Sequence, residues 1–191
     1  MIGILDPARV EADLASGALA CPSCATSLRP WGHARLRRVR DLHAPELQLR
    51  PRRARCPGCA ATHVLLPGTV LPRRADTTAT IGTALAGAAA GHGHRRIAAE
   101  LARPISTVRR WLRAVRGTHP ERLRASALNL LARLDRDAIC GLAPRPNRLA
   151  EALDAVAAAA LAVRARLAPH APIWAVMAAV TGWRLLPFPG D

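Results

Sequence analysis

The sequence predicts a mainly α protein with one small β module near its N-terminus. Two Cys-x-x-Cys pairs enclose a stretch rich in Pro, Gly and Arg. A proline then separates two short amphipathic helices, and Ala- and Leu-rich segments with helical spacing follow to the end of the 191 residues. We therefore expect an N-terminal four-cysteine zinc ribbon, a three-helix domain of the helix-turn-helix type and a C-terminal helical tail.

Residues 1–20 are expected to form a helical segment. Asp6 is suited to cap a helix over residues 7–19, because its carboxylate can accept a hydrogen bond from a free N–H group. Pro7 suits the first helical position, and Gly17 marks the end of the helix. This acidic segment does not have the pattern of a signal peptide.

Residues 21–72 are expected to form the zinc ribbon. Its two cysteine pairs are separated by 31 residues, and its four candidate ligands are Cys21, Cys24, Cys56 and Cys59. Each turn places two sulfurs on one side, and two such turns complete a tetrahedral site with Zn–S distances of ~2.3 Å. Four thiolates leave no position for water, so we expect one structural Zn²⁺ ion. A redox-active pair or two inert pairs are the alternatives.

Other candidate ligands near the ribbon are three histidines. His33, His43 and His63 could each replace a cysteine, but with four thiolates available we expect them on the surface or beside the ligands. Cys140 stands alone in the helical tail and is expected to be a small buried apolar residue.

The charge of the chain points to a polyanionic partner. The 28 basic residues are all Arg and exceed the 13 acidic residues, which gives a formal net charge of +15. Nine of these arginines lie between the two cysteine pairs, with only two acidic residues among them. A solvated charged face is the alternative to phosphate binding. The ribbon arginines that we expect to contact phosphate are Arg37, Arg38, Arg52 and Arg53.

Residues 76–118 are expected to form the helix-turn-helix domain. Asp76 is the expected cap of a first helix to about residue 90, and two short helices follow at about 94–102 and 106–116. The outward face of the last helix is expected to enter a major groove and consists of Ser106, Thr107, Arg109, Arg110 and Arg113. Ser106 would also cap this helix, and Arg95 and Arg96 would contact the DNA backbone. An ordinary helix pair with a basic exterior is the alternative.

Residues 119–191 are expected to form a compact helical tail. Pro120 and Asn147 each open a helix, and a short last helix covers residues 172–181. The apolar faces would form either an internal core or the seam of a homodimer. No apolar stretch approaches the ~20 residues that a bilayer span requires. We therefore expect no membrane association and a cytoplasmic, nucleoid-associated location, where paired cysteines favour metal over disulfides.

Two stretches resemble a known family. Cys56-Pro-Gly-Cys59 followed by THVLLP, and the segment IAAELARPISTVRRWLR, resemble the zinc-ribbon and helix-turn-helix front end of bacterial insertion-sequence transposases, and short bacterial proteins of unknown function built on that plan. The resemblance covers about residues 21–116 and implies DNA recognition. Ala102 departs from it, because the turn position is usually Gly.

The sequence also indicates what the chain lacks. A transposase core needs separated acidic metal ligands, whereas the acidic residues of the tail lie in helical or terminal segments: Glu121, Asp135, Asp137, Glu151, Asp154 and Asp191. We therefore expect a zinc-stabilised protein that binds double-stranded DNA, as a transposase-like recognition module or a transcriptional regulator, and is not an enzyme. The alternatives are a transposase or nuclease component acting with a partner, and a module that binds RNA or protein.

Overall fold

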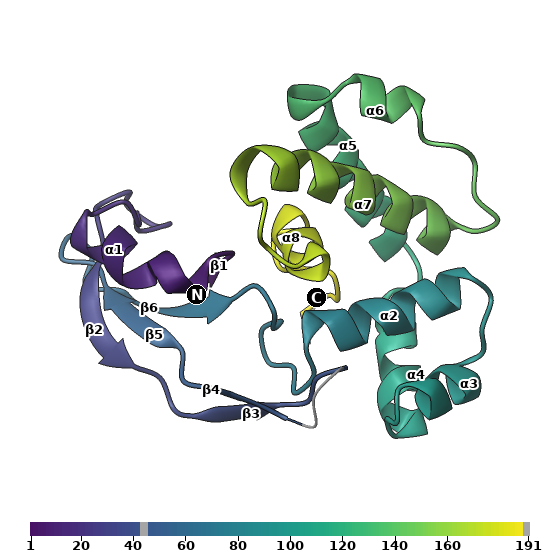
Figure 1. The fold of residues 1–191 in the computed structure, drawn as a ribbon, viewed down its shortest axis with the longest axis horizontal. Helices are drawn as coiled ribbons and strands as arrows, with labels where there is room; N and C mark the ends of the chain where they lie inside the picture. Colours follow the sequence, from purple (N-terminus) through teal and green to yellow (C-terminus); the bar gives the residue numbers. More distant parts are fainter. Residues whose placement is uncertain (43–45, 189–191) are drawn as a thin grey trace.

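The computed structural model describes residues 1–42 and 46–188 of the chain. Figure 1 shows a small sheet at one end of the molecule, a group of helices at the other, and a two-stranded hairpin that extends between them. Helices account for about 46% of the chain, so the expected fold class, mainly α with a small sheet, is confirmed.

A four-stranded sheet forms the N-terminal lobe. Its strands, in spatial order, are β1 (Ile2–Ile4), β6 (Thr62–Pro67), β5 (Arg52–Arg55) and β2 (Arg29–His33). The pairs β6–β5 and β5–β2 are antiparallel, whereas β1 lies parallel to β6. The sequence does not predict β1, because three residues are too few for a period-two pattern and its partner strand lies far along the chain.

The expected N-terminal helix packs on this sheet. It consists of a 3₁₀ turn (Pro7–Arg9) and α1 (Val10–Ala15). Asp6 caps it as expected, because its Oδ1 accepts a hydrogen bond from the N–H of Ala8 at 3.1 Å. The core between helix and sheet contains Val10, Leu14, Leu28, Ala54 and Leu65, together with the sulfur-bearing side chains of Cys21 and Cys56.

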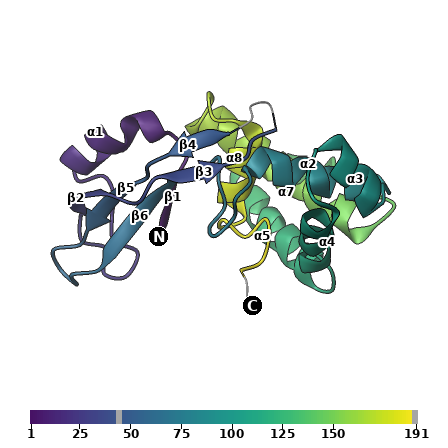
Figure 2. The same ribbon diagram turned by 90° about the horizontal axis from the view of Figure 1, so that it is seen from below.

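A second, two-stranded sheet connects the lobes. Strands β3 (Arg37–Val39) and β4 (Leu47–Leu49) pair antiparallel, with Arg37 opposite Leu49. Figure 2 shows this hairpin running from the sheet lobe to the helical lobe. Val39 is fully buried against Leu66 and Val70, so the hairpin is anchored to the end of β6.

Seven helices within the described residues form the C-terminal lobe. They are α2 (Thr78–Ala89), α3 (His94–Glu100), α4 (Ile105–Ala114), α5 (His119–Leu134), α6 (Asp137–Cys140), α7 (Arg148–Leu167) and α8 (Ile173–Val180). Pro120 lies in the first turn of α5, and Asn147 caps α7 through a hydrogen bond from the N–H of Ala150 at 3.0 Å. A single apolar core extends from Leu71 to Leu186, so the helices expected to bind DNA and the expected tail share one core.

Helix α7 lies at the centre of this core and contacts α2, α5 and α8. Most of its buried residues are alanines, which allow neighbouring helices to approach closely. Its apolar face is therefore used within the chain. Leu161 and Leu167, the exposed leucines of this helix, would be the residues available to the expected homodimer.

The turn between α3 and α4 has a defined C-cap geometry. The N–H of Ala102 donates to the carbonyl of Ala99 at 3.2 Å, and the N–H of Arg103 donates to the carbonyl of Ala98 at 2.9 Å. This is the Schellman pattern, which requires a left-handed residue. Ala102 takes that conformation with φ +49°, whereas α1 and α2 use Gly17 and Gly91 at the equivalent position.

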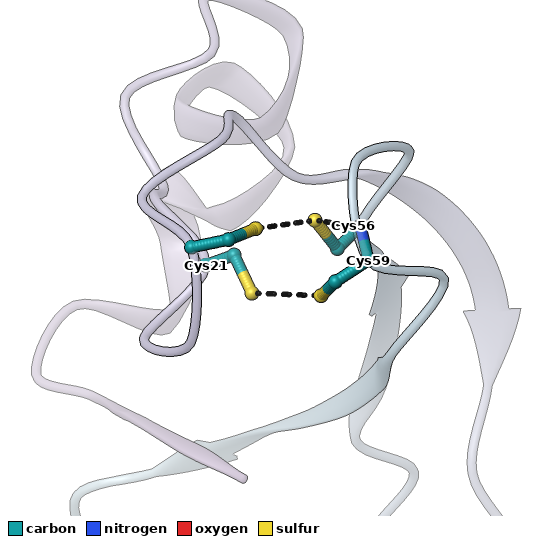
Figure 3. A group of neighbouring side chains, drawn as sticks. Cys21, Cys56 and Cys59 are labelled. Atoms are coloured by element: carbon teal, nitrogen blue, oxygen red, sulfur yellow. Dashed lines mark hydrogen bonds between the residues drawn. The ribbon is translucent and has the colours of Figure 1, made fainter.

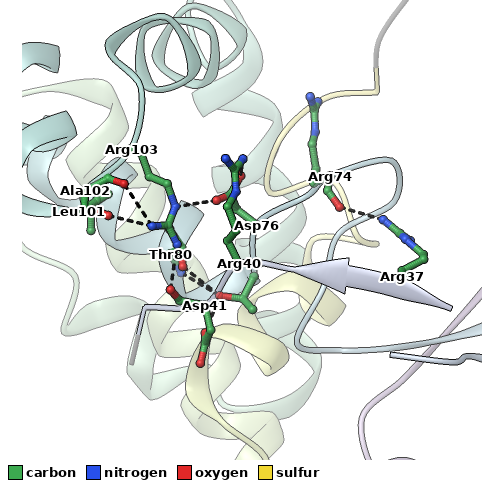
Figure 4. A network of polar contacts seen from close by, with 10 residues as sticks. Arg37, Arg40, Asp41, Arg74, Asp76, Thr80, Leu101, Ala102 and Arg103 are labelled. Atoms are coloured by element: carbon green, nitrogen blue, oxygen red, sulfur yellow. Dashed lines mark hydrogen bonds and ion pairs between the residues drawn. The ribbon is translucent and has the colours of Figure 1, made fainter. Parts of the chain in front are cut away.

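The expected role of Asp76 as a helix cap is wrong. The hydroxyl of Thr77 caps α2, because it accepts a hydrogen bond from the N–H of Thr80 at 3.2 Å. The Asp76 carboxylate is instead buried between two guanidinium groups, with Arg40 Nη2 at 2.7 Å from Oδ2 and Arg103 Nε at 2.7 Å from Oδ1 (Figure 4). Asp76 therefore joins the hairpin, the start of α2 and the turn before α4.

Arg103 extends this network along the turn. Its Nη1 donates to the carbonyl of Leu101 at 3.0 Å, and its Nη2 donates to the carbonyl of Asp41 at 2.8 Å (Figure 4). Because one guanidinium binds both the turn and the hairpin, the orientation of α4 depends on the position of the hairpin.

The C-terminal segment provides a second junction between the lobes. The indole of Trp183 covers Gly3 of β1 so closely that a Cβ atom at Gly3 would lie 1.6 Å from the ring. Gly68, just after β6, lies under the same indole and against Ala175. Nearby, Arg74 Nη2 donates to the carbonyl of Pro187 at 2.8 Å. The expected tail thus also positions the sheet lobe.

Replacing Asp76 by Asn should destabilise the protein strongly. The change leaves Arg103, whose side chain is 11% exposed, without its anionic partner, and breaking such a buried pair costs about 3–5 kcal/mol. Urea unfolding followed by tryptophan fluorescence measures this loss. Glu100→Gln is the matched control, because it removes an exposed pair with Arg96 and should cost under about 1 kcal/mol. Equal losses from both variants would contradict the role given to Asp76.

Replacing Ala102 by Gly should stabilise the protein. The left-handed conformation is unfavourable for Ala and free of strain for Gly, so we expect a gain of about 0.5–1 kcal/mol. Ala99→Gly, at an exposed position inside α3, should instead lose about 1 kcal/mol. Thermal unfolding of the parent protein and the two variants checks the expected gain for Ala102→Gly and the expected loss for Ala99→Gly. A loss of stability in Ala102→Gly would argue against this turn geometry.

Candidate metal centre and nucleic-acid interface

The four cysteines lie on two loops with equivalent backbone geometry. The N–H of Cys21 donates to the carbonyl of Thr26 at 2.9 Å, and the N–H of Cys56 donates to the carbonyl of Ala61 at 2.8 Å. The residue after the second cysteine of each pair is left-handed, with φ +59° at Ala25 and +60° at Ala60. Each loop therefore closes tightly and turns two sulfurs toward the other loop.

The sulfurs meet between the two loops. Cys21 Sγ lies 3.7 Å from Cys59 Sγ, and Cys24 Sγ lies 3.3 Å from Cys56 Sγ (Figure 3). All four sulfurs lie within 4.8 Å of one another. A tetrahedral ion with ~2.3 Å bonds to sulfur would separate the sulfurs by about 3.8 Å, and a disulfide would need about 2.05 Å. The four residues thus fit one metal ion and could hold it with thiolate ligands only.

Local hydrogen bonds and the crowding of the sulfurs shift the thiol pKa values in opposite directions. Contacts from the side chain and backbone of Thr26 lower the pKa of Cys24 to about 6. The backbone of Ala61 lowers the pKa of Cys59, but the neighbouring sulfurs of Cys56, Cys24 and Cys21 outweigh it and raise this pKa to about 12. Four thiolates at these distances repel one another, and a bound cation would remove that repulsion.

His63 lies directly beside the cysteines, in the interior and not on the surface. Its Nε2 is 3.5 Å from Cys21 Sγ, the side chain is buried, and burial lowers its pKa. A neutral imidazole can donate an N–H to a thiolate, which would stabilise the ligand charge. His33 is exposed on β2, and His43 lies outside the described residues. The prediction that Cys140 is buried is wrong, because it is exposed at the end of α6, on the surface of the helical lobe.

Helix α4 presents the predicted DNA-reading face. It is amphipathic, and its buried side chains Val108 and Trp111 hold it in the core of the helical lobe. Three arginines of its outward face are exposed, and their guanidinium groups form no hydrogen bond or ion pair with any residue that the structure describes: Arg109, Arg110 and Arg113.

The expected cap of α4 is not the observed one. The helix begins at Ile105 after Pro104, which occupies the N-cap position, and no side chain caps it. Ser106 therefore lies within the first turn, where its hydroxyl is exposed, and Thr107 beside it is half-buried. Because Pro104 fixes its own φ angle, the helix starts one residue earlier than the sequence suggests.

The two arginines of α3 that are predicted to contact the DNA backbone, Arg95 and Arg96, differ in whether they have a partner within the protein. Arg95 is exposed, and its guanidinium group makes no hydrogen bond or ion pair within the described part of the chain. Arg96 Nε instead donates to Glu100 Oε1 at 2.7 Å, one turn along the helix. A pair this exposed can exchange for a phosphate at little cost.

Two of the four predicted ribbon arginines have internal partners. Arg52 Nε donates to Glu11 Oε1 at 2.6 Å and Nη1 to the carbonyl of Gly32 at 2.7 Å, which fastens α1 to the sheet. Arg37 Nη2 donates to the carbonyl of Arg74 at 2.8 Å. The other two, Arg38 and Arg53, are more available. Arg38 is exposed with a loose pair to Glu46 at 3.7 Å, and Arg53 has no partner among the described residues.

Basic residues of the hairpin lie close to those of α4. Arg37 binds the carbonyl of Arg74 (Figure 4), and the positive charge of Arg110 adds to burial in lowering the pKa of Arg74. Farther along the sheet, Trp31 is 49% exposed and the Arg55 guanidinium lies 4.8 Å from its ring centroid. The hairpin and α4 thus bring Arg37, Arg74 and Arg110 near one another, and the pair of Arg55 and Trp31 lies separately on the four-stranded sheet.

Within the described residues, the four cysteines are the one group of three or more His, Cys, Asp or Glu side chains placed to hold a metal ion. Among the described acidic residues of the tail, Glu121 pairs with Arg148, Glu151 with Arg124 and Asp154 with Arg145, whereas Asp135 accepts a hydrogen bond from the N–H of Ala138. Asp191 lies outside the described residues. No described helix is both long and apolar enough to cross a membrane.

Replacing His63 by Ala should weaken binding of Zn²⁺, used as the probe, by about 10–100-fold, because groups that hydrogen-bond to ligands have effects of this size. Competition with a fluorescent zinc chelator measures the affinity. His33→Ala, at an exposed position on β2, should leave it unchanged. If both variants bind zinc like the parent protein, His63 does not support the site.

Comparison with known proteins gives one match. Residues 21–111 match a domain of unknown function, DUF6431. No curated protein and no solved structure matches the chain. The matched segment begins at the first cysteine and ends within α4. The cysteine loops, the hairpin and the helices up to α4 are therefore similar, as a unit, to that domain.

Proposed function

We propose that this protein is a zinc-stabilised DNA-binding protein whose helix α4 lies in the major groove of a duplex. The observation that carries the proposal is the outward face of α4, where Arg109, Arg110 and Arg113 are exposed without internal partners. Arginine side chains bind guanine O6 and N7 in pairs, so such a face can distinguish bases. Helices α3 and α4 would form the helix-turn-helix, with α2 packed behind them.

The dimensions and position of α4 support this role. An α-helix with its side chains is about 10–12 Å in diameter and the major groove is about 12 Å wide, so the ten-residue α4 can lie in the groove. Arg95 at the start of α3 and Arg38 on the hairpin are exposed and would contact phosphates. We exclude Arg52 from this set, because Glu11 and Gly32 already occupy its guanidinium.

The cysteine cluster would hold one Zn²⁺ in a structural role. Four thiolates complete the coordination of zinc, so the ion would stabilise the ribbon and through it the hairpin that binds Arg103. We further propose that the protein performs no covalent chemistry and works on cytoplasmic, nucleoid-associated DNA, as a transposase-like recognition module or a transcriptional regulator.

Two measurements on the full chain test this function. We expect about one zinc per chain by elemental analysis, and selection from random duplex DNA at two salt concentrations should enrich a motif. Zinc-dependent strand cleavage would instead identify a nuclease component, and tighter binding to single-stranded RNA than to any duplex would identify an RNA-binding module. Either result, or no duplex binding at all, would contradict the proposal.

Single substitutions separate base recognition from phosphate binding. Arg110→Ala should relax the preference at one base pair by about 1–3 kcal/mol. Arg95→Ala should weaken all sequences alike and lower the salt slope by about one. Arg133→Ala, at an exposed position on α5, is the control and should change neither. Equal losses on every probe from Arg110→Ala and Arg95→Ala would refute the assignment of base reading to α4.

A further inference from the structure

The four-stranded sheet has an exposed face along β5 and β2. Ala54 of β5 and Leu65 of β6 point to the opposite, covered face, because both are buried in the core that the sheet forms with α1. Successive side chains of a strand point to alternate faces. Arg53 and Arg55 therefore project from the side of the sheet away from α1, which we call the outer face.

Strand β2 forms the edge of the sheet and brings two more side chains to the outer face. All five of its residues are exposed, and Arg29 lies directly opposite Arg55 in the ladder. Residues that are directly opposite project from the same face. Trp31 follows two residues later, and the Arg55 guanidinium lies 4.8 Å from its ring centroid, which places the indole on this face as well.

The charge of the outer face is positive only. Strands β2, β5 and β6 contain no acidic residue. The guanidinium groups of Arg29 and Arg53 form no hydrogen bond or ion pair with the part of the chain that the structure describes. Like charges directly opposite in a ladder, such as Arg29 and Arg55, repel each other. An anion bound on this face would relieve that repulsion.

Trp31 adds a flat apolar surface to these charges. Its side chain is 49% exposed, so a second ring can approach it. An exposed aromatic ring among arginines is the arrangement on which unpaired nucleobases stack, while the cations follow the phosphates. The bases inside a duplex already stack on one another, so such a ring favours a single strand.

We propose that the outer face of the ribbon binds single-stranded DNA, with an unpaired base stacked on Trp31 and phosphates bound by Arg29 and Arg53. Charge complementarity and the exposed indole carry the proposal. Every base has a flat face, so the site would accept any sequence. Figure 1 shows β2 at the end of the molecule remote from α4. The site therefore goes beyond the duplex-binding function proposed for α4 and does not depend on it.

The test uses the zinc-loaded full chain and an oligothymidylate of about 12 nucleotides, within the ~4–16 nucleotides that small single-strand-binding folds cover. Anisotropy of a labelled oligonucleotide gives the affinity, and quenching of tryptophan fluorescence by an unlabelled one reports stacking. Trp31→Ala should weaken binding by about tenfold or more and remove the quenching. Trp31→Phe keeps an aromatic ring and should stay within about fivefold of the parent protein.

Two control variants match these changes. Leu161→Ala removes another exposed apolar side chain, on α7, and should alter the affinity by less than about twofold. Arg29→Gln should lower the salt slope of oligothymidylate binding by about 0.7, the value for one phosphate of a single strand. Arg133→Gln removes the same charge from an exposed position on α5 and should not lower it. Zinc content and thermal unfolding like those of the parent protein show that the variants are folded.

Three results would overturn the proposal: no saturable binding of the oligothymidylate, equal affinities of Trp31→Ala and Leu161→Ala, or equal salt slopes of Arg29→Gln and Arg133→Gln. Tighter binding of an oligouridylate of the same length would assign the face to RNA and so contradict it too. Trp31→Ala should leave duplex binding unchanged, because β2 is remote from α4. Single-strand binding that depends on Trp31 can persist even if the chain binds no duplex, so the two proposals can fail separately.

Discussion

The carboxylate of Asp76 is the constraint on which the arrangement of this molecule depends. It is nearly inaccessible to solvent and lies between Arg40 from the hairpin and Arg103 from the turn before α4. Two cations held at such short range need an anion between them, and this one lies on the segment that starts α2. Hairpin, α2 and the turn before α4 are thereby held in one relative orientation, and the surface proposed to bind DNA draws residues from the hairpin, α3 and α4.

The same principle explains where the excess of arginine is left exposed. Acidic residues in the described part of the chain are mostly paired with arginines that join elements, such as Glu11 with Arg52 and Glu121 with Arg148. These pairs fasten α1 to the sheet and α5 to the start of α7. On the outward face of α4, the guanidinium groups of Arg109, Arg110 and Arg113 have no acidic partner among the described residues, and a polyanion would neutralise them there.

Alanine replaces glycine at three positions that need a left-handed backbone. Ala25 and Ala60 close the two cysteine loops, and Ala102 ends α3. The left-handed conformation is unfavourable for an alanine by itself, so the surrounding structure must impose it at each of these positions. At Ala102 the hydrogen bonds of the turn and the binding of Arg103 by Asp76 provide that constraint. The departure from glycine noted in the sequence therefore does not prevent a tight turn between α3 and α4.

The sequence by itself determined the features that depend on neighbouring residues. These are the cysteine pairs, the caps provided by Asp6 and Asn147, and the helical spacing that ends at the prolines, because turn and helix chemistry is local. Only the tertiary structure decided that Asp76 is an ion-pair centre, that Arg52 binds Glu11, that His63 lies against Cys21, and that β1 joins β6. Those contacts join residues far apart in the chain. The local sequence around Asp76 fits a helix cap, and only the fold brings Arg40 and Arg103 to its carboxylate.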